Sequence, residues 1–308
     1  MFIKKAQRQK AKLRIGVFGA SGSGKTTSAL YLAYGLVKDW AKICVIDTEN
    51  QSADLYANHT PVLLGEKCET LGDYNTLTLE APYTPERYIE AIKMCVDEGM
   101  EAVVIDSISH EWEGKGGCLE IKEQLDLGGG NSNTYINWGK VTPRHNAFIQ
   151  AMLTAPIHIV ATARVKTDVA LSTNEKGKAV PQKVGLKSVT RDGFDYEMTT
   201  CFDIEAGSHL AKVSKDRTGI FEGRPEWVIS SNDGDLLGQW ADSGSEVIER
   251  PLTKEELLNE VVKYSRETKT SYQDSVKLFL NEGESDLGQI PESERRNRLK
   301  KVRTVQGV

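Results

Sequence analysis

The chain has 308 residues and a formal net charge of −5, with 39% hydrophobic and 27% charged residues. This balance predicts a globular protein with one large domain and an appendage, and it argues against uniform coating by nucleic acid while allowing a local basic patch. No apolar run approaches the roughly 20 residues of a membrane span, and the basic start of the chain lacks the apolar core of a signal peptide. We therefore expect a cytoplasmic protein with no membrane partner.

The cysteines are odd in number and widely spaced, with no C-x-x-C pair. They are Cys44, Cys68, Cys95, Cys118 and Cys201. This pattern favours reduced thiols over disulfides or a zinc site.

The first elements are an arm, a strand and a helix. Residues 1–12 are polar and basic without a clear period, which predicts an arm that orders only against a partner; a solvated tail is the alternative. Residues 13–18 are apolar and β-branched, as in a buried strand. Apolar residues then recur at helical spacing from Ala29 to Val37.

Between this strand and helix lies a glycine-rich segment, Gly19 to Thr26, that fits the P-loop pattern G-x-x-x-x-G-K-[ST]. Its backbone N–H groups and the helix N-terminus favour a nucleoside triphosphate, and the flanking strand and helix make a chance glycine turn a poor alternative. Lys25 is expected to contact the β- and γ-phosphates, and Thr26 to hold Mg²⁺. The expected nucleotide contacts are Gly19, Ser21, Gly22, Ser23, Gly24, Lys25, Thr26 and Thr27.

Two further strands each end in acidic residues. Residues 42–47 form a buried strand that runs into Asp47-Thr48-Glu49-Asn50, where ligands bind in open α/β sheets. Glu49 is thus a candidate general base for the attacking water, or simply a solvated carboxylate. After a strand at 75–80 and a helix between Thr84 and Gly99, residues 102–106 form a strand that ends at Asp106, in the Walker B manner. Asp106 is expected to complete the Mg²⁺ shell through water.

The next stretch, 113–142, is rich in glycine and predicts a long loop around a short helix at 119–125. Tyr135 and Trp138 in this loop could stack on bases, although aromatics that anchor a loop to the core are as frequent. A helix through 144–152 follows.

A strand at 157–162 then ends near Arg164, so Thr162 or Arg164 could sense the γ-phosphate. The next stretch, 165–193, carries six basic and three acidic residues and suits a phosphate backbone, with a solvated insertion as the alternative. Residues 196–205 and 209–214 predict an antiparallel hairpin turning at Gly207.

Two cations follow this hairpin in Lys215-Asp216-Arg217-Thr218-Gly219. They fit a solvated turn or contacts with the triphosphate of a neighbouring subunit. From about residue 243 a helical tail begins, with a capping box at Thr253 and a basic last segment that suits nucleic acid, an acidic neighbour or solvent.

These motifs, in this order, resemble those of RecA-family ATPases between about residues 13 and 227. Within that family the chain looks most like the short single-strand annealing ATPases of bacteriophages. The resemblance implies an α/β fold: a RecA-like P-loop NTPase core at 13–243 with a mostly parallel central sheet extended by antiparallel strands, preceded by the arm at 1–12 and followed by a small helical appendage at 244–308.

The resemblance also implies roles for single residues. The acid that matches Glu49 activates water, the Walker B aspartate matches Asp106, and Lys215 and Arg217 match cations that act across a subunit interface in RadA. In RadA that motif is K-N-R-F-G, so its roles can be assigned better to Lys215 and Arg217 than to the other residues of the motif. The stretches 113–142 and 165–193 occupy the places of the family's DNA-binding loops.

We therefore expect an ATPase that uses ATP and Mg²⁺, is stimulated by DNA, and anneals or exchanges single-stranded DNA as a homo-oligomeric filament or ring. A single-strand DNA-binding protein is a further expected partner, and the host cytoplasm is the expected location if the gene is carried by a phage. One alternative is a DNA scaffold that binds ATP but hardly hydrolyses it. Another is a P-loop small-molecule kinase, which the scarcity of arginine in 165–193 disfavours.

Overall fold

The computed structural model describes residues 6–63, 65–128, 134–173, 179–245, 252–281 and 284–306. The chain divides into two compact units, residues 1–245 and 246–308, which are described separately. Among the described residues, no helix is both long and apolar enough to cross a membrane.

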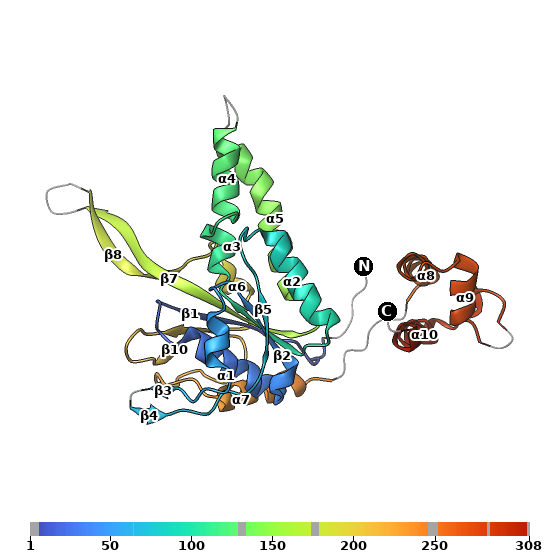
Figure 1. The fold of residues 1–308 in the computed structure, drawn as a ribbon, viewed down its shortest axis with the longest axis horizontal. Coiled ribbons are helices and arrows are strands. Elements are labelled where there is room, and N and C mark those ends of the chain that lie inside the picture. The colour runs from blue at the N-terminus through green and yellow to red at the C-terminus, as the bar shows by residue number, and fades with distance from the viewer. Residues whose placement is uncertain are drawn as a thin grey trace. The chain divides into compact units, whose positions relative to one another are not determined.

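The first unit is built on a mostly parallel sheet with the strand order β10-β9-β1-β7-β6-β2-β5 (Figure 1). Its strands are β1 (Arg14–Gly19), β2 (Ile43–Asp47), β5 (Asn75–Thr78), β6 (Ala102–Asp106), β7 (His158–Thr173), β9 (Thr200–Ile204) and β10 (Ala211–Asp216). Strand β10 runs antiparallel to β9, and β8 (Ala179–Ser188) pairs antiparallel with β7. The expected α/β fold, a parallel sheet extended by antiparallel strands, is confirmed. A separate two-stranded sheet joins β3 (Val62–Leu63) to β4 (Glu66–Lys67).

Helices cover both faces of the central sheet, which is why its inner strands are mostly apolar. Successive residues of β2 fall alternately into the two cores, with Val45 in one and Ile46 in the other. Helices α1 (Lys25–Val37) and α7 (Ser231–Asp242) cover the first face. Helices α2 (Pro85–Asp97) and α5 (Thr134–Thr154) cover the second.

Two helices and a hairpin project from this core (Figure 1). The stretch 113–142, predicted as a long loop around a short helix at 119–125, is mostly helical. The short helix is present as α4 (Cys118–Leu127), α3 (Ser109–Glu113) precedes it, and α5 begins ten residues before the helix predicted at 144–152. Residue 144, the predicted start of that helix, follows Pro143, but Pro143 lies inside α5. Buried Val141 and Phe148 continue the apolar stripe across it.

The stretch 165–193, also predicted as a loop, contains a long antiparallel hairpin. Strand β7 runs past the sheet, and its outer part pairs with β8 from Val165↔Ser188 to Thr173↔Ala179. An alternation of β-branched or apolar residues at Val165, Thr167, Val169 and Leu171 could have revealed this strand in the sequence. The frequent lysines in this stretch made the alternation hard to recognise.

Two smaller predictions also need correction. The strand expected from Tyr196 begins at Thr200, because a short helix, α6 (Phe194–Glu197), precedes it. Part of the N-terminal arm packs against its own domain: Lys10 N–H donates to Ser245 O over 2.9 Å, and the Arg8 guanidinium lies 4.3 Å from the Trp240 ring centroid. For these residues the prediction of order only against a partner is wrong.

The second unit contains three helices around a small apolar core. They are α8 (Lys254–Thr268), α9 (Tyr272–Phe279) and α10 (Glu292–Gln306). The Thr253 capping box is present, with reciprocal bonds to Glu256. Part of the basic charge of α10 is neutralised within the unit, since Arg298 pairs with Glu284 and Glu294 while Arg303 contacts two further glutamates. These arginines therefore have structural partners.

The closest approach between α1 and α7 depends on glycine. A Cβ on Gly35 would lie 2.1 Å from Ser231 O and 2.6 Å from the Gly234 Cα, whereas a Cβ on Gly238 would meet Leu36 O only at 3.5 Å. The first contact is impossible without moving a helix, and the second is ordinary van der Waals contact.

We therefore predict opposite effects for two glycine-to-alanine changes. Gly35→Ala should lower the free energy of unfolding by about 2 kcal/mol, a typical cost of overpacking. Gly238→Ala is the matched control and should leave stability unchanged or raise it by up to about 1 kcal/mol through helix propensity. Urea unfolding followed by circular dichroism measures both. Equal effects of the two changes would contradict this packing argument.

Candidate nucleotide and metal site

The glycine-rich loop lies at the carboxyl edge of the sheet, between β1 and α1. Gly22 and Gly24 adopt positive φ angles of 74° and 93°, which let the loop curl tightly ahead of the helix. The Lys25 ammonium is nearly buried and donates to Ala20 O over 2.8 Å. Burial lowers the pKa of Lys25, and the nearby Asp106 carboxylate opposes that shift. The loop thus forms a cradle, with one cation folded across it, that fits a phosphate chain.

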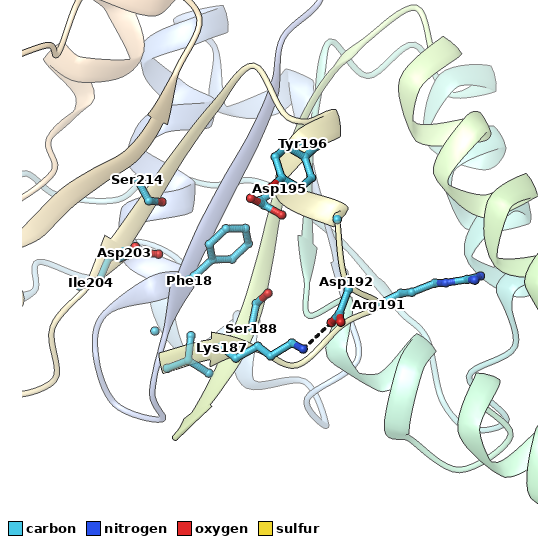
Figure 2. Close-up of a pocket in the computed structure, with 13 residues that line it drawn as sticks. Phe18, Lys187, Ser188, Arg191, Asp192, Asp195, Tyr196, Asp203, Ile204 and Ser214 are labelled. Atoms are coloured by element: carbon cyan, nitrogen blue, oxygen red, sulfur yellow. Dashed lines mark ion pairs between the residues drawn. The ribbon is translucent and has the colours of Figure 1, made fainter. Parts of the chain in front are cut away.

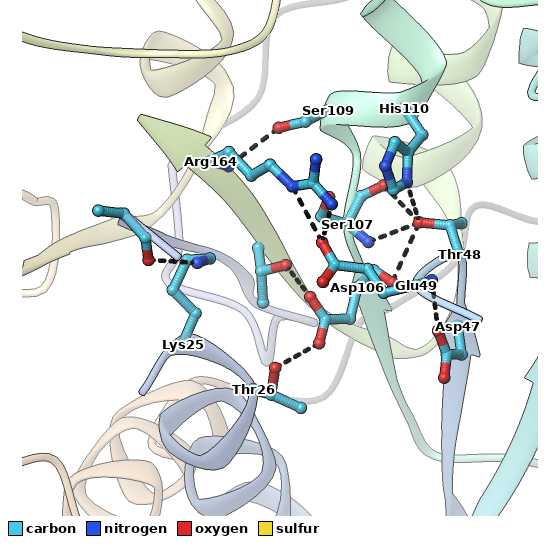
Figure 3. Close-up of polar contacts among 12 residues, drawn as sticks. Lys25, Thr26, Asp47, Thr48, Glu49, Asp106, Ser107, Ser109, His110 and Arg164 are labelled. Carbon is cyan, nitrogen blue, oxygen red and sulfur yellow. Dashed lines mark hydrogen bonds and ion pairs between the residues drawn. The ribbon is translucent and has the colours of Figure 1, made fainter. Parts of the chain in front are cut away.

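Asp106 lies at the centre of the site (Figure 3). Its two carboxylate oxygens accept hydrogen bonds of 2.5 Å from the Thr26 and Thr162 hydroxyls, which come from α1 and β7. Complete burial raises the pKa of Asp106, and the two hydroxyls partly offset this shift. Carboxylate and hydroxyl oxygens are the ligands Mg²⁺ prefers, so Thr26 and Asp106 together fit the expected metal position.

Glu49 lies close to this centre and is held by a cation. The Asp47 carboxylate accepts hydrogen bonds from the backbone N–H groups of Glu49 and Ala53, which fixes the turn after β2. Glu49 Oε1 then accepts bonds from Arg164 Nη2 at 2.8 Å and Nε at 3.1 Å. The structure therefore brings together Glu49 and Arg164, the candidate base and a candidate phosphate sensor.

A polar network that the sequence analysis missed joins the ends of β2 and β6 (Figure 3). The Thr48 hydroxyl lies 2.7 Å from His110 Nδ1 and accepts a bond from the Ser107 N–H over 2.9 Å. Burial, with Arg164 nearby, lowers the pKa of His110, so the imidazole is neutral near pH 7. The signal available in the sequence was a serine and a histidine within four residues of Asp106.

His209 is a second residue that the sequence analysis missed. It lies in the turn before β10 with a φ of 56°, and its Nδ1 is 3.0 Å from Ser23 O. Because the carbonyl accepts, Nδ1 carries the proton and donates. The turn between β9 and β10 therefore packs directly on the P-loop.

Lys215 and Arg217 lie at the other end of the sheet from the P-loop. Lys215 pairs with Cys201 at the start of β9, whereas Gly19 of the P-loop pairs with Ile204 at its end. Both cations donate to the carbonyl oxygen of Tyr196. Within one chain, these two residues are therefore not part of the nucleotide site.

Two hollows flank residues 187–192, at the base of the β7–β8 hairpin. One, of about 590 Å³, contains Phe18, Asp195 and Tyr196, and Figure 2 shows Arg191 extending away from them. The other, of about 580 Å³, is lined by Trp112, Trp138, Lys166, Lys187, Ser188, Thr190, Arg191 and Asp192.

The second hollow combines an aromatic stack with cations. The Trp112 and Trp138 rings are stacked, with centroids 5.7 Å apart. Arg191 Nη1 is buried and has no hydrogen-bond partner among the described residues. An unsatisfied guanidinium nitrogen beside stacked rings suits an anionic aromatic ligand. The side chain of Tyr135, the other aromatic singled out in the sequence, lies outside the described residues.

A glycine cradle, a buried lysine and a strand-end aspartate bonded to the helix threonine define this chain as a P-loop NTPase, which implies nucleotide binding. A family model described as an AAA domain (AAA_24) matches residues 11–228, so the chain belongs to that AAA domain family. No curated protein sequence matches significantly. Among 158 matching chains of solved structures is the RadB recombinase, at 22% identity over 71% of this chain and 85% of that one, with a TM-score of 0.34.

We expect Lys25→Ala to weaken nucleotide binding by at least about 30-fold, because a charged hydrogen bond contributes roughly 2 kcal/mol. Lys38→Ala is the matched control, since Lys38 lies just past the other end of α1 and pairs with Asp235. Titration with a fluorescent ATP analogue measures both affinities. Equal affinities of the two variants would show that Lys25 does not contact the phosphates.

Proposed function

We propose that this protein is an ATPase that binds single-stranded DNA and promotes annealing or strand exchange, with the ATPase core at 13–243. The observation that carries the proposal is the path of β7. This strand contributes Thr162 to the Asp106 centre and Arg164 to the Glu49 ion pair, and it then continues into the projecting hairpin. A single strand thus joins the hydrolytic centre to the proposed DNA-binding element.

Different residues of the chain would have different roles at the triphosphate. Lys25 would bind the β- and γ-phosphates, Thr26 and Asp106 would hold Mg²⁺, and Glu49 would orient and deprotonate the attacking water. Bound Mg²⁺ would neutralise charge on the phosphates. In the structure Glu49 Oε1 is occupied by Arg164, so full activity requires that this pair loosen or that the other carboxylate oxygen act.

The second hollow supports DNA binding. Stacked Trp112 and Trp138 offer a platform for an unpaired base, and Arg191 and Lys166 supply cations for the adjoining phosphates. A DNA strand bound here would shift the conformation of the base of the hairpin and with it the position of Arg164. Release of Glu49 from Arg164 would then make hydrolysis DNA-stimulated.

The proposed oligomer accounts for Lys215 and Arg217. Because these cations lie at the end of the sheet opposite to their own P-loop, they would complete the triphosphate site of a neighbouring subunit.

The RadB structure is described as a recombinase, and recombination in a phage-type setting, in a host cytoplasm and beside a single-strand DNA-binding protein, is the corresponding role proposed for this chain.

The central test is Glu49→Gln, which should lower the rate of ATP hydrolysis by about 100-fold or more, because the amide cannot accept the proton of water. ATP binding should be retained. Glu90→Gln, an exposed carboxylate on α2, is the control and should leave turnover unchanged. Phosphate release and nucleotide titration measure the two properties. Turnover retained in Glu49→Gln would show that the assigned base is wrong.

A second test addresses DNA. Trp138→Ala should weaken binding of a single-stranded oligonucleotide by about 10-fold, since base stacking contributes roughly 1–3 kcal/mol per base. Trp138→Phe keeps a stacking face and should retain most of the affinity. Fluorescence anisotropy of a labelled oligonucleotide measures both, with circular dichroism to check folding. Equal affinity of wild type and Trp138→Ala would place the DNA elsewhere.

Two alternatives make different predictions for the same proteins. A scaffold that binds ATP only as a structural ligand would keep annealing activity in Lys25→Ala, whereas the proposed ATPase would lose it. A small-molecule kinase would bind nucleotide with the same affinity whether or not single-stranded DNA is present.

A further inference from the structure

Three buried side chains outside the nucleotide site meet at the base of the projecting helices. Glu111 of α3, Cys118 at the start of α4 and His145 of α5 are 1%, 0% and 4% exposed. Cys118 Sγ is 3.0 Å from Glu111 Oε1, and His145 Nδ1 is 3.1 Å from each carboxylate oxygen. One potential ligand atom from each residue lies within 4.8 Å of the others.

The local backbone is shaped to bring these residues together. A Cβ on Gly117 would lie 2.7 Å from the carbonyl oxygens of both His110 and Glu111, so only glycine lets α4 begin this close to α3. From the other side, Arg144 forms a two-point ion pair with Glu86 of α2 at 2.6 and 2.7 Å. This pair anchors α5 one residue before His145.

Without a bound cation, the buried charge of the Glu111 carboxylate is costly for this cluster. A carboxylate removed from water is costly unless it is paired. Here its neighbours are the Cys118 thiol and the His145 ring. Burial and the Glu111 charge raise the pKa of the Cys118 thiol, which therefore stays protonated. A divalent cation would change this balance, because a thiolate and a carboxylate together cancel its charge and the imidazole binds it in neutral form.

We propose that Glu111, Cys118 and His145 form a binding site for a divalent cation of the zinc class. The sulfur, nitrogen and oxygen donors favour zinc over Mg²⁺ or Ca²⁺, which prefer oxygen ligands alone. Zinc–ligand bonds of about 2.0–2.3 Å in a tetrahedron put donor atoms roughly 3.5 Å apart, close to the 3.0 and 3.1 Å of the hydrogen-bonded cluster. Binding would release the proton of the Cys118 thiol.

This site would fasten α3, α4 and α5 at one point. The His145 ring packs edge-on against Trp112, with centroids 5.5 Å apart, and Trp112 in turn stacks on Trp138. The cation would therefore fix the helices that carry the aromatic pair. The inference rests on the cluster alone and holds whether or not the protein binds DNA.

Cobalt is the probe for the experiment, because a thiolate bound to Co²⁺ gives a charge-transfer absorption band. The full chain is reduced with a phosphine, stripped of metal with a chelator, and titrated with Co²⁺ and then Zn²⁺. We expect one equivalent of Co²⁺ to produce the band and Zn²⁺ to abolish it. Zn²⁺ should also raise the melting temperature of the stripped protein.

The controls separate this cluster from other thiols. Cys118→Ser should lose the band and bind at least about 100-fold more weakly, whereas Cys68→Ser, which alters the one cysteine that is not buried, should behave as wild type. If Cys118→Ser fails to fold, His145→Gln replaces it, since its amide can keep a bond to Glu111. The proposal is overturned if folded wild type binds no stoichiometric Co²⁺ or Zn²⁺, or if the band survives in Cys118→Ser or His145→Gln.

Discussion

The buried Asp106 carboxylate is the constraint on which the site depends. Its two oxygens are taken by Thr26 of α1 and Thr162 of β7, so one charged group ties the P-loop helix to two neighbouring strands. A fully buried carboxylate is costly unless hydroxyls or cations compensate it, and here two hydroxyls do so. The site is therefore preorganised, and a bound cation would replace interactions that the protein already provides.

The same strand that stabilises Asp106 leads outward. Two positions after Thr162, Arg164 holds Glu49, and its backbone N–H donates to Ser109 Oγ at the start of α3. Helix α3 opens the helical projection, and β7 continues as the hairpin. Both projections therefore begin at or beside Arg164, which contacts Glu49. If a ligand bound to either projection is coupled to the nucleotide site, that coupling is reciprocal, and nucleotide would alter the affinity for the ligand by the same factor.

The sequence was sufficient to predict those features of the fold that a local pattern of residues determines. Gly19 to Thr26 specified the turn between strand and helix, and the apolar runs that end at Asp47 and Asp106 specified two buried strands. The full length of the helical projection was missed because α5 continues through Pro143, where buried Val141 and Phe148 stabilise the helix. The Arg164–Glu49 pair, like the contact from His209 to the P-loop, joins residues more than 100 positions apart. Such contacts follow from strand order, which no local pattern contains.

The cluster of Glu111, Cys118 and His145 shows the same limit more sharply. Its spacings match no short metal motif, and the cysteines read as isolated thiols. The glycine turn at 114–117 and the Arg144–Glu86 pair hold three helices in the positions that bring these residues together. A buried acid, imidazole and thiol are an expensive way to fill a helix junction that apolar side chains could fill. Their presence at the base of the projection therefore points to a requirement beyond packing, and the charge balance of a divalent cation meets it.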